Sequence, residues 1–252
     1  MLPLERRERL VALLQERKTA TTEELAAELD VSIMTVRRDL ELCQREGRIQ
    51  RCYGGAIISQ KTVLEAPYDQ KMTTGRERKK VLAKLAAKLV EPGMTVYLDA
   101  GTTTYSLAEE LAAMEKLTII TNDLKIALRM LSSPAEVVVL GGKVQKRTGS
   151  MIGDTTLEQM SGLRATIAFV GAASIDEKLA ALTPTQDKVA LKRSIRSIAQ
   201  KSYLIADASK FHSSALYCVD HLMDYDGVIT DAIFTESERR LLGKKTRLIT
   251  PE

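Results

Sequence analysis

The alternation of hydrophobic and polar residues divides the chain into a short helical region and a longer region of mixed character. Near the start, hydrophobic residues at helical spacing predict a helix over residues 4–16. A second, short helix begins with the capping-box pair Thr21 and Glu24, and a third runs from a cap at Ser32 to a stop at Gly47. The second and third helices are therefore joined by a very short connection.

The third helix separates an inner face from an outer face. Val36, Leu40 and Cys43 recur at helical spacing and are expected to face the core. The residues left partly or wholly on the outer face are Met34, Thr35, Arg37, Arg38 and Glu41. Two closely joined helices are typical of a helix-turn-helix, whose second helix lies in the major groove of DNA with its first residues at the base edges. The third helix is therefore a candidate for reading duplex DNA.

A hairpin is predicted directly after the third helix. Residues 48–51 and 56–58 alternate as two short strands around a glycine-rich turn at residues 52–55, the pattern of a wing. Arginine pairs with guanine, and arginine, serine and threonine all bind phosphate oxygens. The candidate DNA-binding residues are Thr22, Ser32, Met34, Thr35, Arg37, Arg38, Arg48 and Arg51. On the helix patterns alone, an ordinary three-helix unit with a solvated charged face explains residues 4–58 equally well.

From Pro92 onward, strands, loops and helices alternate. Strands are predicted over residues 95–98, 117–120, 137–140, 167–170, 203–206, 227–230 and 247–249. This alternation favours an α/β fold with a mostly parallel sheet covered by helices on both faces. A long helix over residues 77–89 precedes the sheet, and the basic run at its start is interpreted as a solvated face rather than a contact with DNA or ligand.

These patterns predict two domains joined by a linker. Residues 1–58 form the small winged helix-turn-helix domain, and residues 75–252 form the larger α/β domain. Residues 59–74 show no clear period and are interrupted by Pro67, so we interpret them as the linker. A length of 252 residues suits two domains of these sizes.

Small and polar residues follow several of the predicted strands. The run Asp-Ala-Gly-Thr-Thr-Thr at residues 99–104 brings hydroxyls and amides to a helix start, where the helix dipole favours an anion such as phosphate. Ligands of parallel sheets bind beyond the carboxyl ends of the strands. The candidate effector-binding residues are Asp99, Gly101, Thr102, Thr103, Thr104, Asn122, Gly141, Gly142, Lys192, Asp207 and Lys210. Taken alone, the threonine turn is explained as a capped helix start; together with the other strand ends it favours a phosphorylated polyol.

The positions of the charged residues, rather than the net charge, indicate a binding partner. The net charge is +4, but residues 1–57 contain ten Lys or Arg and ten Asp or Glu, a net charge of zero. The case for DNA therefore rests on the local cluster of Arg37, Arg38, Arg45, Arg48 and Arg51. The three cysteines are widely spaced and only two histidines are present, so we expect neither a disulfide nor a metal site, and no cofactor. No signal peptide or membrane span is predicted, so a cytoplasmic protein is expected.

Both regions resemble one known family. The segments Val-Ser-Ile-Met-Thr-Val-Arg-Arg-Asp-Leu at residues 31–40 and Arg-Cys-Tyr-Gly-Gly-Ala at residues 51–56 resemble the winged helix-turn-helix of the DeoR family of bacterial transcription regulators, which usually has histidine at the position of Tyr53. The segments at residues 99–104, 121–122, 141–142, 207–211 and 229–231 occur in the order of the DeoR-type sensor domain. Many members carry glutamate where this chain has Ala190.

The resemblance implies a fold, partners and an activity. It implies a sensor domain similar in fold to ribose-5-phosphate isomerase, binding of double-stranded operator DNA as a homodimer or homotetramer, and control by a phosphorylated sugar. It also implies repression of a sugar-metabolism operon. The Ala190 difference implies an altered sugar-hydroxyl end of the pocket.

A second hypothesis is a sugar-phosphate isomerase-like enzyme with a DNA-binding appendage. Such an isomerase needs a carboxylate beside the substrate carbonyl. The isomerases that the domain resembles carry an acidic segment where this chain has Val-Gly-Ala-Ala at residues 170–173. Asp99 and Asp207 remain as possible bases, so the alternative stays open. We nevertheless expect a sensor without catalytic residues.

Overall fold

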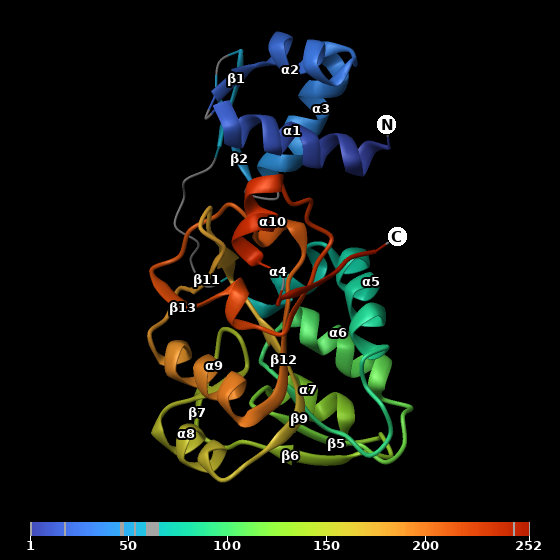
Figure 1. Ribbon diagram of the computed structural model, residues 1–252, viewed down its shortest axis with the longest axis vertical. Coiled ribbons are helices and arrows are strands. Elements are labelled where there is room, and N and C mark those ends of the chain that lie inside the picture. The colour runs from blue at the N-terminus through green and yellow to red at the C-terminus, as the bar shows by residue number, and fades with distance from the viewer. Residues whose placement is uncertain are drawn as a thin grey trace.

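The structure, a computed structural model, places a small N-terminal domain on top of a larger sheet domain (Figure 1). It describes residues 2–17, 19–45, 48–52, 54–58, 66–243 and 245–251, apart from the side chains of Gln15, Arg45, Gln50, Ile57 and Ile58. The predicted helix stop at Gly47, the turn residue Tyr53 and the predicted linker residues 59–65 lie outside the described residues.

The N-terminal domain combines helices with a small antiparallel sheet. Its described elements are α1 (Pro3–Arg17), β1 (Thr19–Thr21), α2 (Thr22–Leu29), α3 (Ile33–Arg45), β2 (Ile49–Cys52) and β3 (Gly55–Ile58). The strand order is β1-β3-β2, so the predicted wing hairpin gains a third strand. Strand β1 was not predicted, because three residues are too few to show an alternating pattern. The fully buried side chains of Leu10, Leu14, Leu25 and Val36 form the centre of this domain.

The predicted caps explain where the helices of this domain begin. The Thr21 hydroxyl accepts a hydrogen bond from the Glu24 amide, and the Glu24 carboxylate accepts one from the Thr21 amide, which completes the capping box. At α3, the Ser32 hydroxyl accepts the Thr35 amide at 3.2 Å. Asp30, in the left-handed conformation with φ of 52°, turns the chain between the two helices. The helix-turn-helix geometry is therefore encoded locally.

The larger domain is built on a seven-stranded sheet in which all described pairings are parallel. Its strands are β4 (Thr95–Leu98), β5 (Thr118–Thr121), β6 (Glu136–Val139), β9 (Ala165–Gly171), β12 (Ala199–Ile205), β14 (Gly227–Ile229) and β15 (Arg247–Ile249). The order is β15-β14-β12-β9-β4-β5-β6, so the chain winds outward in both directions from β4 and β9. This confirms the predicted α/β fold.

Helices cover both faces of this sheet (Figure 1). One face packs against α5 (Arg76–Ala87), α6 (Thr102–Leu111) and α7 (Leu124–Met130), and the other against α8 (Asp154–Ser161), α9 (Asp187–Ile198) and α10 (Glu236–Leu242). Alternate residues of β4 divide between the two layers: Val96 and Leu98 belong to the first and Tyr97 to the second. Each face of the sheet therefore packs into its own hydrophobic core.

Several short elements were not predicted. They are the hairpin β7 (Lys143–Gln145) and β8 (Ser150–Ile152), the antiparallel strands β10 (Ser174–Ile175), β11 (Ala180–Thr183) and β13 (Tyr217–His221), and the 3-10 turns η1 (Ala208–Lys210) and η2 (Leu222–Asp224). Each contains five residues or fewer. Segments this short carry too little periodic signal for sequence patterns to identify.

A helix also lies inside the predicted linker. Helix α4 (Tyr68–Thr73) is anchored on the sheet domain, because the Tyr68 amide donates to the Arg147 carbonyl at 3.0 Å. The Tyr68 ring lies edge-on to Tyr105, with ring centroids 6.4 Å apart, and Lys125 lies over it at 4.0 Å. The described end of the linker, residues 66–74, is therefore an ordered part of the sheet domain.

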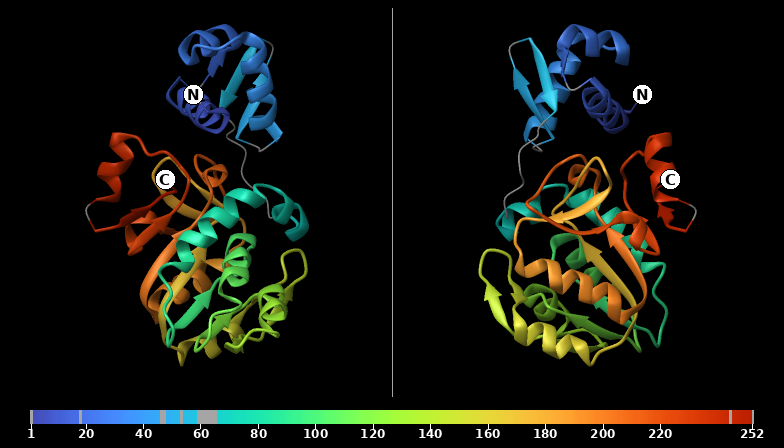
Figure 2. Two further views of the ribbon diagram at one scale, coloured as in Figure 1. Left: turned by 90° about the vertical axis from the view of Figure 1, so that its right-hand side faces the viewer. Right: turned by 60° about the vertical axis from the view of Figure 1, so that its left-hand side comes forward.

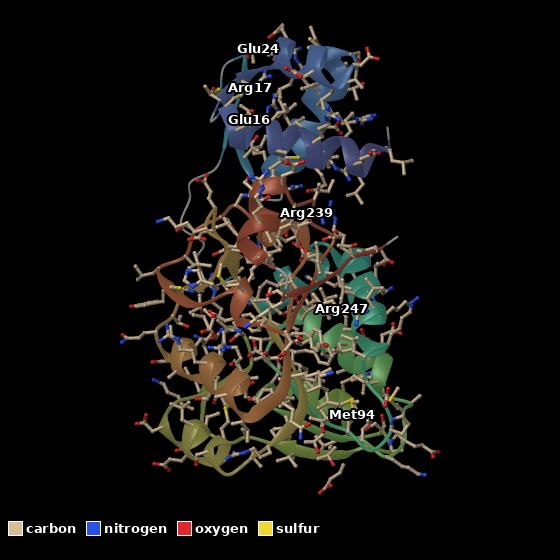
Figure 3. The ribbon with its side chains drawn as sticks, viewed as in Figure 1. Glu16, Arg17, Glu24, Met94, Arg239 and Arg247 are labelled. Atoms are coloured by element: carbon tan, nitrogen blue, oxygen red, sulfur yellow. The ribbon has the colours of Figure 1, made fainter. Side chains whose placement is uncertain are left out.

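The carboxyl edge of the sheet faces the N-terminal domain. Ala208 and His212, which follow β12, and Ala232, which follows β14, line one cavity together with Glu8 and Arg9 of α1. Figure 3 shows Arg239 of α10 directly below the N-terminal domain and Met94, just before β4, at the far end of the molecule. In the two turned views the N-terminal domain again lies beyond one end of the sheet domain, with α10 to one side of it (Figure 2). No helix in the described ranges is long and apolar enough to cross a membrane.

Candidate nucleic-acid interface and anion pocket

The outer face of α3 presents most of the predicted DNA-binding side chains together. Met34, Arg37 and Arg38 are exposed and Thr35 is half-buried, whereas Val36 and Leu40 on the opposite face are buried. Asp39 pins the helix to α1, because its carboxylate accepts a hydrogen bond from Arg6 Nε at 2.6 Å. The exposed arginines are thus carried by a helix fixed from behind.

Two of the predicted DNA-binding residues lie elsewhere. Arg48 is only 7% exposed, and its guanidinium donates to the Glu8 carboxylate at 2.9 and 2.7 Å. Thr22 is buried, and its hydroxyl donates to the Gly54 carbonyl at 2.7 Å. These side chains hold the domain together, so we remove both from the set of DNA contacts. Arg51 on β2 is exposed and stays in that set.

A cavity at the carboxyl edge of the sheet collects the anion-binding groups. It has a volume of about 110 Å³ and lies where β4 and β9, the strands from which the chain winds apart, end side by side. We call it the anion pocket. Its lining includes Ala66, Lys71, Gly101, Thr102, Thr103, Thr104, Gly171, Ala172, Ala173, Thr183, Lys188, Lys192 and Lys210. A switch point of this kind is where parallel sheets bind ligands.

The start of α6 forms one wall of the anion pocket. The helix begins at Thr102, three residues earlier than the predicted start at Tyr105, so the amides of all three threonines lie in its first turn. Amides of a first helical turn have no acceptor within the helix and point outward. The Gly101 amide donates to Asp123 at 3.1 Å, which fixes the turn before the helix. The wall therefore offers N–H groups, hydroxyls and the positive end of a helix dipole to an anion.

Lysines supply the charge of the pocket. Lys192 donates to the Gly171 carbonyl at 2.7 Å and forms a buried ion pair with Asp99. Asp99 also accepts the Gly171 amide at 3.0 Å, so it acts as a clamp beneath the pocket. Lys71, Lys188 and Lys210 line the same cavity. The lining lysines outnumber Asp99 and Asp207, the predicted carboxylates beside them, which favours an anionic ligand.

Asp207 supports the pocket from behind. It is buried and caps η1 by accepting the Ser209 amide at 3.0 Å. Burial acts to raise the pKa of Asp207, but the Lys210 ammonium and the Ser209 hydrogen bonds outweigh it and hold the pKa below its ordinary value. Asp207 is therefore a charged partner that positions Lys210.

Five predicted effector residues do not line the anion pocket. Two of them, Asp99 and Asp207, lie beneath and behind it and hold its lysines, whereas Asn122, Gly141 and Gly142 lie apart from it. Asn122 is fully buried, accepts the Tyr97 hydroxyl and donates to the Met151 carbonyl. Gly141 bonds to the side chains of α8, and a Cβ added at Gly142 would lie 2.2 Å from Thr156 Oγ1. These residues follow β5 and β6, which lie on the edge side of β4 away from β9. In the structure these three residues pack the edge of the sheet and do not line the anion pocket, so we leave them out of the proposed ligand contacts.

Other pocket residues were missed by sequence reasoning. Lys71 comes from the predicted linker, Lys188 precedes Lys192 by one helical turn, and the segment 171–173 was noted only for its lack of acids. The spacing of Lys188 and Lys192 was the available signal, since residues four apart share a helix face. The strand order that brings segment 171–173 beside Gly101 leaves no such signal in the sequence.

Metal-ligating side chains and cysteines were the remaining candidates for chemistry in the described residues. Within the described ranges, no group of three or more His, Cys, Asp or Glu side chains is arranged to hold a metal ion. Cys43 is buried, Cys52 and Cys218 are exposed, and all three are free thiols.

Comparisons with known proteins agree with this architecture. Residues 6–62 match the family model of the DeoR-like helix-turn-helix domain, and residues 74–232 match that of the DeoR C-terminal sensor domain. The chain is 35% identical to the HTH-type transcriptional regulator YgbI of Escherichia coli (strain K12) over 97% of its length and 96% of that protein.

Two further comparisons concern a regulator and a solved structure. The chain is 30% identical to the glycerol-3-phosphate regulon repressor of Escherichia coli (strain K12), with 92% of each chain covered. A ribose 5-phosphate isomerase A from Methanocaldococcus jannaschii is similar in structure, with a TM-score of 0.41 and 19% identity over 55% of each chain.

Proposed function

The chain belongs to the DeoR family of transcriptional regulators, and from this we propose that a phosphorylated sugar or related polyol phosphate controls its affinity for operator DNA. As a member of this family it is a DNA-binding transcriptional regulator. We propose that it represses a carbohydrate-metabolism operon, as the similarity to the glycerol-3-phosphate regulon repressor supports. The ligand would occupy the anion pocket.

The outer face of α3 is the proposed reading surface. Thr35, Arg37 and Arg38 follow the capped start of the helix, which is the part that meets base edges in a helix-turn-helix. Ser32 and Met34 flank these residues, and Arg51 on the wing strand would contact phosphate. The arginines suit both guanine recognition and phosphate binding.

The convergence of lysines on the start of α6 carries the effector proposal. Lys71, Lys188, Lys192 and Lys210 come from three separate segments and surround the first-turn amides of one helix. The pocket is small, at about 110 Å³, and its wall of amides, hydroxyls and lysines suits a phosphate attached to a short polyol.

We propose binding without turnover. Asp99 is buried and held by Lys192 and by the amides of Ala100 and Gly171, and Asp207 is buried and held by Ser209, so both carboxylates already have partners within the protein. The pocket segment 171–173 contains glycine and alanine only. Incubation of sugar phosphates with the purified protein should leave them unchanged. Isomerisation in proportion to protein concentration would instead establish the enzyme alternative.

We propose that the protein acts in the cytoplasm as a homodimer or homotetramer. A symmetric assembly presents two reading helices to two half-sites, which predicts a palindromic or repeated operator. The genes that the operator controls should encode enzymes for the ligand.

The DNA proposal is tested with an operator that the full-length protein selects from a pool of random duplexes. Fluorescence anisotropy should give an affinity for that duplex at least about 1,000-fold higher than for an unrelated duplex at physiological salt. Equal affinities for the two duplexes would refute the reading surface.

The effector proposal is tested by thermal unfolding with a panel of sugar phosphates and the same sugars without phosphate. A ligand at 100 times its Kd should stabilise the folded state by about 2.7 kcal/mol. Lys210→Ala should abolish this shift, whereas Lys84→Ala, an exposed change on α5, should not. Equal shifts from phosphorylated and unphosphorylated sugars would refute the anion site.

A further inference from the structure

Four charged side chains alternate in sign across the junction between the two domains. Arg48 forms the two hydrogen bonds to Glu8 described above, Arg78 Nη2 lies 3.6 Å from Glu8 Oε1, and Arg78 Nε lies 3.6 Å from Asp231 Oδ2. The side chains are between 4% and 14% exposed. We call these four residues the junction chain. Charges this buried depend on their partners, because an isolated buried charge is costly.

One end of the junction chain reaches the anion pocket. Asp231 Oδ1 accepts the Ala208 amide at 2.6 Å. Ala208 is the first residue of η1, and Lys210, the last, lines the pocket. A ligand that attracts the Lys210 ammonium therefore acts on a three-residue turn whose other end is bonded to the junction chain.

A second connection runs through the start of α5. Lys79, the neighbour of Arg78, is buried and donates to the carbonyls of Thr74, at 2.7 Å, and of Lys71. Lys71 lines the anion pocket from α4. The backbone segment that carries Arg78 is thus bonded to another wall of the same pocket. The basic run here was interpreted as a solvated face, but the structure buries Lys79 and most of Arg78.

The other end of the junction chain reaches the reading surface. Glu8 lies on α1 one helical turn from Leu4 and two residues after Arg6, and Arg6 holds Asp39 of α3. Arg48 immediately precedes the wing strand β2. A shift of Glu8 therefore acts on both DNA-binding elements. A cavity of about 320 Å³ beside Glu8, Arg48 and Ala208 leaves room for such a shift.

We infer that the junction chain transmits occupancy of the anion pocket to the DNA-binding domain, with Arg78 as the link between the domains. This inference rests on the proposed function, which places a phosphorylated ligand in that pocket. Ligand binding moves η1 and α4, and the four buried charges re-pair as a unit rather than one at a time. Packed ionic networks switch between discrete arrangements in this way. Coupling is reciprocal, so operator binding must also alter η1.

Reciprocity allows a test that does not require the ligand. Hydrogen exchange of the full-length protein is measured with and without its selected operator duplex, and the reporter is the peptide that contains the Ala208 amide. In the natural protein, operator binding should change the exchange rate of that amide at least about 5-fold, the lower end of allosteric couplings. Arg78→Met should remove the change. Arg76→Met, which deletes an exposed arginine from the same helical turn, should retain it.

A second variant covers the case in which Arg78→Met does not fold. Asp231→Asn keeps an acceptor for the Ala208 amide but removes the charge that faces Arg78, and it should also lose the change. No operator effect in the natural protein, an effect that survives in a folded Arg78→Met or Asp231→Asn protein, or a loss in Arg76→Met would each overturn the inference.

Calorimetry with glycerol 3-phosphate and glucose 6-phosphate separates the inference from the proposed function. If neither compound binds while the exchange coupling follows Arg78, the effector proposal loses support and the junction chain stands. If a compound binds in the pocket and the exchange coupling is absent, the effector proposal stands and the junction chain is refuted.

Discussion

The reading surface and the anion pocket use positive charge in opposite ways. Arg37, Arg38 and Arg51 are exposed on a domain whose core they do not enter. Lys192 in the pocket is buried against Asp99, and Lys79 behind it is buried against backbone carbonyls. Because exposed charges are solvated in the free protein, they add little to its stability. Function and stability are therefore separable at the surface and bound together in the pocket.

The largest effect that this comparison predicts concerns Lys192. Lys192→Met leaves the buried Asp99 carboxylate without its cation, so the free energy of unfolding should fall by about 3–5 kcal/mol. Urea unfolding followed by circular dichroism measures the loss. The double change Lys192→Met with Asp99→Asn removes both charges and should recover most of it. A loss below about 1 kcal/mol in the single variant would place Lys192 with the surface charges.

The next effect is a pH dependence from Lys79. Burial lowers the pKa of Lys79 from 10.5 to about 8 in the folded protein. Between these values the unfolded chain binds more protons, so the contribution of Lys79 is unfavourable below pH 8 and is relieved as the pH rises toward 10.5. Relative to Lys79→Met, which does not titrate, the natural protein should gain up to roughly 3 kcal/mol over this window.

Urea unfolding of both proteins at several pH values between 7 and 10 gives the difference. A constant gap between the two proteins would mean that the Lys79 ammonium is as well solvated as in the unfolded chain. In that case the contrast between buried and exposed charge would not extend to the residues behind the pocket.

The same contrast explains how far sequence reasoning reached. The helix-turn-helix was predicted because its caps at Thr21 and Ser32, and the hydrophobic spacing of Val36 and Leu40, act within a few residues of the chain. The strands of the sheet domain were predicted from similarly local patterns. Their order was not, and the pocket depends on that order, since it forms between the ends of β4 and β9.

The predicted residues that lie outside the two sites have the same explanation. Gly101 follows a strand of the sheet, and so do Asn122, Gly141 and Gly142. The last three lie away from the pocket only because β5 and β6 lie on the far side of β4 from β9. Arg48 looked like a wing arginine because its partner Glu8 lies forty residues earlier in the chain. Pairings over such distances are set by tertiary packing and leave no periodic pattern.

Substitutions on the exposed face of α3 should weaken operator binding while leaving the free energy of unfolding almost unchanged. Arg37→Ala or Arg38→Ala should each weaken operator binding by about 1–3 kcal/mol per half-site, or about 5- to 150-fold, if the side chain pairs with a base. The free energy of unfolding should change by no more than about 0.5 kcal/mol, because both side chains are exposed.

Fluorescence anisotropy with the selected operator gives the affinity, and urea unfolding gives the stability. Arg17→Ala is the matched control, since it removes an exposed arginine from α1 that pairs with Glu28. Loss of folding stability in the Arg37 or Arg38 variant would show that the surface is not separable from the core.

Arg48 and Arg51 are three residues apart and show the same contrast between a buried and an exposed arginine. Arg51→Ala removes one exposed charge from the wing, so the slope of the logarithm of operator affinity against the logarithm of salt concentration should become shallower by about 1 per subunit. Arg48→Ala removes a buried partner of Glu8, so it should lower the free energy of unfolding and leave the salt slope nearly unchanged. Anisotropy titrations at several salt concentrations distinguish the two. An equal change of slope in both variants would mean that Arg48 leaves Glu8 when DNA binds, and the surface would then extend into the junction between the domains.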